Sequence, residues 1–113
     1  MNDIVLGTLG EFIFSLALDE IDEIILIVYN SDKNELNRFA DYYNEHYDGW
    51  TEDGSESFKI YYALEELEDC IRELNTFRFI PQHIIDKYSL PFEWDKNGIA
   101  ELNNLKTIVE LQK

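Results

Sequence analysis

Carboxylates and aromatic rings gather in the segment Tyr42–Glu56, which carries five acids, four aromatic residues, one histidine and no lysine or arginine. Clustered carboxylates first suggest a calcium loop, because Ca²⁺ prefers oxygen ligands. An EF-hand needs oxygen ligands at positions 1, 3 and 5 and glycine at position 6. A loop that starts at Asp48 places Trp50 at position 3, and a loop with Gly54 at position 6 starts at Gly49. Neither register works, so the segment does not encode an EF-hand.

The sequence also gives no support for a zinc site or for a nucleophilic active site. The chain has one cysteine, Cys70, and two histidines, His46 and His83, which lack the H-E-x-x-H spacing of a zinc helix. Neither a G-x-S-x-G motif nor a glycine-rich phosphate loop is present. Acids flank Cys70, and their charge disfavours the thiolate that a nucleophile requires. We therefore predict no enzyme, no metal site and no cofactor, with His46 as an exposed residue at a helix end.

The charge of the chain is its strongest signal. Its 113 residues suit one domain over 1–113, and 24 acids against 9 bases give a net charge of −15. Residues 41–73 hold eleven acids and two bases, whereas residues 74–113 hold five of each. Such a field repels nucleic acid and anionic lipid and attracts basic partners. We expect no direct binding to nucleic acid or membrane.

A cytoplasmic location fits the remaining signals. The first basic side chain is Lys33, so the N-terminus lacks the positive region of a signal peptide. The apolar stretch Phe12–Leu18 is too short to span a bilayer. A single cysteine cannot form an internal disulfide, which is typical of a reducing compartment.

Two stretches supply the candidate binding surface. On a helix over 64–74, acids three and four residues apart stand side by side and form a rigid negative row. In the preceding segment, Tyr47 and Trp50 are residue types enriched at interface hot spots, and Gly49 and Gly54 permit an unusual loop shape. The alternative is that Trp50 folds back onto the core. The predicted partner-binding residues are Asp41, Glu45, Tyr47, Asp48, Trp50, Glu52, Asp53, Glu56, Glu65, Glu66, Glu68, Asp69 and Glu73.

Hydrophobic periodicity predicts the elements that position these residues. Apolar spacing after a Thr8–Glu11 capping box favours a helix over 9–19, with a β-hairpin as the alternative. The unbroken apolar run at 24–29 predicts a buried central strand at 23–29. An amphipathic stripe after Asp32 and Glu35 predicts a helix over 33–47, followed by a loop through Ser57.

The second half of the chain reads as mixed elements. We predict a strand over 58–63, a helix over 64–74, a short strand over 77–80, a helical turn over 82–88 and an ordered loop over 90–94. A last helix over 98–110, capped by Asn97, competes with an edge strand over 107–111. The predicted fold class is α/β (α+β), a small single-domain sandwich with helices packed on a sheet of three or four strands.

Two function hypotheses follow. In the first, the protein is a small acidic inhibitor that occupies the basic nucleic-acid-binding surface of a partner, as a nuclease or another nucleic-acid-binding protein would offer. Phage anti-defence proteins (anti-CRISPR and anti-restriction inhibitors) and immunity proteins against nuclease toxins are similar in size, charge and aromatic content. In the second, it is a cytoplasmic adaptor or small-ligand module whose acidity serves solubility only. The oligomeric state stays open.

Overall fold

The N-terminal part of the chain folds as antiparallel strands. In this computed structural model, which describes residues 3–18, 23–88 and 92–111, β1 (Ile4–Leu9) and β2 (Phe12–Leu18) form a hairpin. Gly10 begins the two-residue turn with a φ of 59°, a conformation that glycine adopts at little cost. The predicted helix over 9–19 is therefore wrong for its described residues, and its alternative, the hairpin, is correct.

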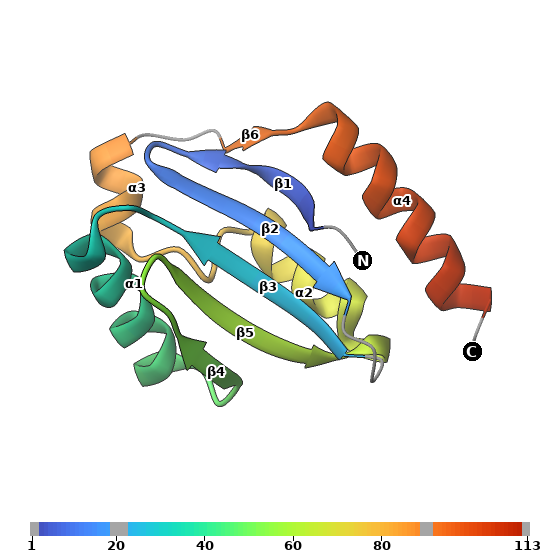
Figure 1. Cartoon of the computed structure of the whole chain (residues 1–113), viewed down its shortest axis with the longest axis horizontal. Coiled ribbons are helices and arrows are strands. Elements are labelled where there is room, and N and C mark those ends of the chain that lie inside the picture. The colour runs from blue at the N-terminus through green and yellow to red at the C-terminus, as the bar shows by residue number, and fades with distance from the viewer. Residues whose placement is uncertain (1–2, 19–22, 89–91, 112–113) are drawn as a thin grey trace.

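Six strands form one antiparallel sheet in the order β4-β5-β3-β2-β1-β6 (Figure 1). β3 (Glu23–Tyr29) lies in its interior between β2 and β5 (Ser57–Ala63), which confirms the predicted strands at 23–29 and 58–63. β4 (Trp50–Asp53) and β6 (Glu93–Trp94) form the two edges. The sheet thus has six strands rather than three or four, and β4 occupies part of the stretch that was predicted as loop.

Three helices follow the predicted ranges closely. α1 (Lys33–His46) begins after Asp32, whose carboxylate accepts the N–H of Asn34 at 3.0 Å. A 3₁₀ turn, η1 (Leu64–Glu66), leads into α2 (Leu67–Asn75), and α3 (Gln82–Tyr88) forms the predicted helical turn. The predicted helices over 33–47 and 64–74 are confirmed within a few residues.

The segment after α2 is a helix-ending turn and not the predicted strand over 77–80. Phe77 has a φ of 59°, its N–H donates to the Leu74 carbonyl at 3.1 Å, and the N–H of Arg78 donates to the Glu73 carbonyl at 3.1 Å. These two bonds make a Schellman motif, in which glycine usually takes the left-handed position. Phenylalanine holds that position here.

The C-terminal helix α4 (Lys96–Leu111) lies along the edge of β1 (Figure 1). Asp95, rather than the predicted Asn97, caps it by accepting the N–H of Gly98 at 2.8 Å. The alternative of an edge strand over 107–111 is wrong. Of the predicted ordered loop over 90–94, residues 90 and 91 lie outside the described residues, and Glu93 and Trp94 form β6.

Side chains alternate between the two faces of the sheet. Phe12, Phe14 and Phe58 point to the face that α1 covers, and the Phe39 ring of α1 lies 5.8 Å from Phe12 and 6.2 Å from Phe58 between centroids. Residues of α2 and α3, including Cys70 and Ile84, join the same buried cluster. The chain is therefore an α+β domain with one hydrophobic core.

Candidate partner-binding surface

The hairpin of β4 and β5 holds Trp50 away from the core. In its ladder Trp50 stands opposite Tyr61 and Glu52 opposite Lys59, on the face that does not carry Phe58 and Ile60. The Trp50 side chain is 83% exposed, so the alternative in which it folds back onto the core is wrong.

Contacts with α1 determine where β4 starts. A Cβ atom at Gly49 would lie 2.4 Å from the Tyr43 hydroxyl, so any other residue here would require the Tyr43 side chain or the backbone to shift. One residue after Trp50, the Thr51 hydroxyl donates to the Asn44 side-chain oxygen at 3.1 Å. These contacts tie the beginning of β4 to the end of α1.

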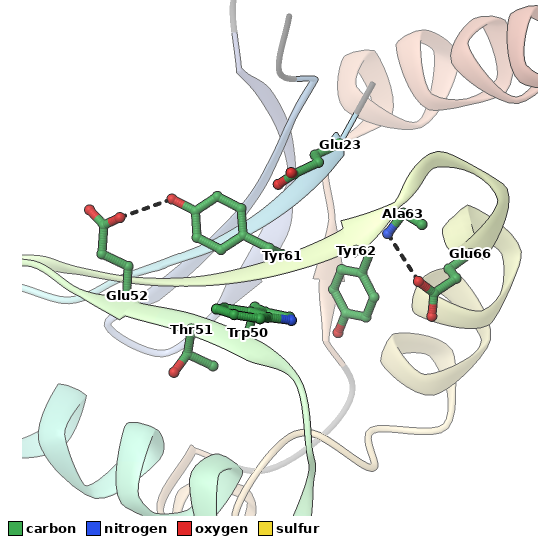
Figure 2. A pocket seen from close by; sticks show the side chains of 8 residues that line it. All are labelled: Glu23, Trp50, Thr51, Glu52, Tyr61, Tyr62, Ala63 and Glu66. Atoms are coloured by element: carbon green, nitrogen blue, oxygen red, sulfur yellow. Dashed lines mark hydrogen bonds between the residues drawn. The ribbon is translucent and has the colours of Figure 1, made fainter. Parts of the chain in front are cut away.

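An open groove of about 640 Å³ lies at this end of the sheet, and we call it the notch (Figure 2). The β4–β5 ladder stops at the Trp50–Tyr61 pair, whereas the β3–β5 ladder continues to the pair of Glu23 and Ala63. The last two residues of β5 therefore project beyond β4 and leave a step. The notch is lined by Glu23, Trp50, Thr51, Glu52, Tyr61, Tyr62, Ala63 and Glu66.

Aromatic rings and carboxylates make up the polar chemistry of the notch. Figure 2 shows the rings of Trp50 and Tyr61 with carboxylates around them. The Tyr61 hydroxyl donates to Oε2 of Glu52 at 3.1 Å, and the backbone N–H of Ala63 donates to Oε1 of Glu66 at 3.0 Å. Each of these two carboxylates is thus oriented by one hydrogen bond and has a second oxygen that can accept more.

The acidic row on η1 and α2 begins at the notch. Glu65, Glu66, Glu68 and Asp69 are exposed, and Glu66 belongs to both the row and the notch. Burial raises the pKa of the half-buried Glu73 carboxyl above its ordinary value, and Asp69 raises it further, while Arg78 and Arg72 lower it. Arg72 forms an ion pair with Asp69. This ion pair offsets the charge of Asp69 within the row.

Five other predicted binding residues lie outside the notch. Asp41, Glu45 and Asp48 are exposed on α1 and just after it, and Asp53 and Glu56 are exposed at the turn of the β4–β5 hairpin. None of these five lines the notch. Of the thirteen predicted residues, the structure brings Trp50, Glu52 and Glu66 together there.

Tyr47 differs from Trp50, with which it was grouped. Its ring stacks on Tyr43 with centroids 4.8 Å apart, and its hydroxyl donates to the Arg78 carbonyl at 2.7 Å. Burial is the main cause that raises the pKa of this hydroxyl. Tyr47 thus connects α1 to the turn after α2.

Glu23, Tyr61 and Tyr62 line the notch but were not predicted as site residues. The alternation of Phe58, Ile60 and Tyr62 in the sequence does place Tyr61 on the opposite face from the core. This alternation alone does not identify Tyr61 as a site residue, because Trp50 stands beside Tyr61 only through the pairing of β4 with β5. The contribution of Glu23 depends on the antiparallel pairing that places the beginning of β3 beside the end of β5.

The surroundings of Cys70 disfavour the thiolate that nucleophilic chemistry requires. The thiol is buried, and burial, with smaller contributions from Glu73 and Glu66, raises its pKa to about 12. In the described part of the chain, no three His, Cys, Asp or Glu side chains converge so as to hold a metal ion. None of the described helices combines the length and apolarity that crossing a bilayer requires.

Comparison of the chain with protein-family models, with curated proteins and with solved structures gave no significant match. The functional argument therefore rests on the residues and their geometry.

Proposed function

We propose that this protein is a small acidic inhibitor that covers the basic nucleic-acid-binding surface of a partner protein. The observation that supports this proposal is the row of exposed carboxylates that runs from the notch along η1 and α2. Residues 50–73 contain eight acids and two bases, and one of those bases, Arg72, already pairs with Asp69. A negative surface of this kind can pair with lysine and arginine side chains that otherwise contact phosphates.

The acidic row places like charges side by side, although Glu68 and Asp69 lie in the first turn of α2, where the helix dipole favours carboxylates. Like charges three or four residues apart on a helix destabilise it by a few tenths of a kcal/mol each, about 0.2–0.5. The row contains several such pairs, including Glu65 with Glu68 and Glu65 with Asp69. Basic groups of a partner would turn this repulsion into attraction and would give fast, salt-dependent association.

The partner that fits best is a nuclease or another nucleic-acid-binding protein. A phage anti-defence protein and an immunity protein against a nuclease toxin would both meet such a partner in the cytoplasm, where a lone thiol such as Cys70 stays reduced.

Capture with the tagged full chain tests the proposal. A partner identified by mass spectrometry is purified, and its binding to nucleic acid is measured with and without this protein. We expect competition, and we expect capture to weaken steeply between about 50 and 200 mM salt. A partner whose nucleic-acid binding is unaffected, or whose capture ignores salt, would favour the adaptor hypothesis and overturn this one.

Charge reversal identifies the surface responsible. The double variant Glu65→Lys/Glu68→Lys changes two exposed residues of the row that lie outside the Ala63 cap and the Arg72 pair. The matched control is Glu101→Lys/Glu110→Lys, with two exposed acids on α4. We expect the first variant to lose competition and the control to keep it. Equal losses would mean that net charge alone matters.

A further inference from the structure

The notch carries a combination of groups suited to a planar cation. Its Trp50 indole is 83% exposed, and aromatic faces attract cations through the negative charge of their π-systems. Tyr61 stands directly opposite Trp50, and three carboxylates, Glu23, Glu52 and Glu66, line the same groove (Figure 2). A large exposed indole beside ordered polar groups is typical of a binding hot spot.

We propose that the notch receives an arginine side chain of the basic partner, with its guanidinium stacked on Trp50 and paired with the surrounding carboxylates. This inference rests on the proposed function for the identity of the partner, and it adds the point of contact. It also predicts a binding activity that can be measured without the partner.

The negative charge of the notch excludes most other ligands. Three carboxylates repel an anion, and a second copy of the chain, with a net charge of −15, would bring more negative charge to the surface. The nearest basic residue in the ladder is Lys59, which stands directly opposite Glu52, two residue pairs from Trp50 and Tyr61 in the direction of the hairpin turn. Among the described residues, no lysine or arginine lines the notch.

Arginine fits better than lysine because its charge is planar. A guanidinium can stack on an indole and still direct its N–H groups sideways to carboxylates, whereas an ammonium is a compact, strongly hydrated point charge. The hydrogen bonds from Tyr61 to Glu52 and from Ala63 to Glu66 hold these carboxylates in place before a partner arrives. Such preorganisation lowers the entropy cost of binding.

The groove volume of about 640 Å³ exceeds the size of a single side chain. The flanking residues of the arginine therefore also have room, and a short extended segment is the expected form of the ligand.

Tryptophan fluorescence provides a direct test. The chain has two tryptophans, and Trp94→Phe leaves Trp50 as its only tryptophan. This variant is titrated with peptides of six arginines, six lysines or six citrullines, citrulline having the shape of arginine without its charge. We expect saturable quenching by the arginine peptide, affinity for the lysine peptide at least about threefold lower, and no response to the citrulline peptide.

Variants locate the bound peptide. In the Trp94→Phe background, Glu23→Gln/Glu52→Gln should lower the affinity for the arginine peptide about tenfold, since hydrogen bonds to charged groups are worth a factor of this size. Glu101→Gln/Glu110→Gln on α4 removes the same charge elsewhere and should change the affinity by less than about twofold. Trp50→Ala, followed by calorimetry and checked for folding by circular dichroism, should lower it similarly to the notch variant.

The outcomes separate this inference from the proposed function. Equal affinity for the arginine and lysine peptides, or affinity unchanged by Trp50→Ala, would overturn the notch as an arginine site. Partner capture that depends on Glu65 and Glu68 but not on Trp50 would also overturn it, while leaving the proposed function in place. If the protein binds the arginine peptide specifically but competes with no nucleic-acid-binding partner, the notch inference stands and the proposed function is overturned.

Discussion

Carboxylates near the two ends of α1 differ in their burial and in the number of basic side chains around them. Near its N-terminus the Glu35 side chain is only 10% exposed and has three basic neighbours: Nη1 of Arg38 at 3.3 Å, Nε2 of His83 at 3.6 Å and Nζ of Lys87 at 3.8 Å. Beyond its C-terminus the acids of the notch and of α2 are mostly exposed, and the one ion pair found for them among the described residues is Arg72 with Asp69.

Burial explains the difference. A buried carboxylate requires compensation because water no longer stabilises its charge, so the fold brings His83 and Lys87 on α3 to Glu35. Exposed carboxylates are stabilised by water and place no such demand on the fold. Basic groups of this chain are thus used where the fold needs them, and the acidic surface is left for solvent or for a partner.

Alkaline pH should have the largest effect on the stability of the fold. It ionises buried groups near the exposed acids of the notch and of α2, where basic side chains are few. Burial raises the pKa of Cys70 to about 12 and raises the pKa of Tyr62 and Tyr43 above the ordinary tyrosine value. The unfolded chain ionises near the ordinary values, while the folded chain keeps these groups neutral. Stability is therefore fully present below pH 9 and lost as the pH rises towards about 12.

Melting temperatures measured from neutral pH upward check this expectation. Cys70→Ala should flatten the first part of the decline and Tyr62→Phe the part above the ordinary tyrosine pKa. A thiol reagent should modify Cys70 only as the protein unfolds, because the native thiol is buried and neutral. A melting temperature that stays constant through this range would show that these groups do not limit alkaline stability.

Glu35→Ala should have the next largest effect. It removes the group on which three basic side chains converge and that connects α1 to α3, and we expect a loss of about 1–3 kcal/mol in the free energy of unfolding. Glu45→Ala is the matched control, an exposed acid on the same helix that should change stability by less than about 0.5 kcal/mol. Urea denaturation measures both, and equal losses would remove the contrast between the two ends of α1.

Tyr47 and Trp50 allow the same contrast among aromatic residues. Tyr47 packs on Tyr43 and Phe79, so Tyr47→Ala should cost about 2 kcal/mol and Tyr47→Phe, which removes one hydrogen bond, about 1 kcal/mol. The exposed Trp50 should tolerate alanine within about 0.5 kcal/mol. Thermal or urea unfolding measures these differences. A large loss for Trp50→Ala would mean that its ring supports the fold, and its role in binding would need another explanation.

Strong periodicity allowed much of the fold to be predicted. The apolar run of β3 and the stripe on α1 were interpreted correctly because long, regular patterns leave one solution. In β2 the buried Phe12 and Phe14 alternate with the exposed Ile13, yet the same stretch also matches a helical spacing. Only pairing with β1 and β3, which the spacing of residues within this stretch does not show, decides between the two.

The turn after α2, the strand β4 and the notch could not be predicted from their residue types alone. The left-handed conformation at Phe77 ends α2 without the glycine that marks such turns, so a strand was predicted there. β4 is a four-residue edge strand with two acids, a composition that protects an edge but weakens a strand signal. The notch exists only because β4 stops short of the end of β5, which is why its residues could be predicted only in part.

Added salt should have the smallest effect, and it tests the acidic end as a whole. Raising the ionic strength from about 0.01 to about 0.1 M shortens the Debye length from about 30 to 10 Å, which screens repulsion among exposed carboxylates. We expect the melting temperature to rise by up to about 4 °C, the shift that 1 kcal/mol of relieved repulsion would give. Glu65→Gln/Glu68→Gln should raise the melting temperature at low salt and reduce its response to salt. Glu101→Gln/Glu110→Gln, in the part of the chain without net charge, should do neither. If both double variants respond alike, the carboxylates of η1 and α2 are too dispersed to form a local field, and the surface loses the property that would attract a basic partner.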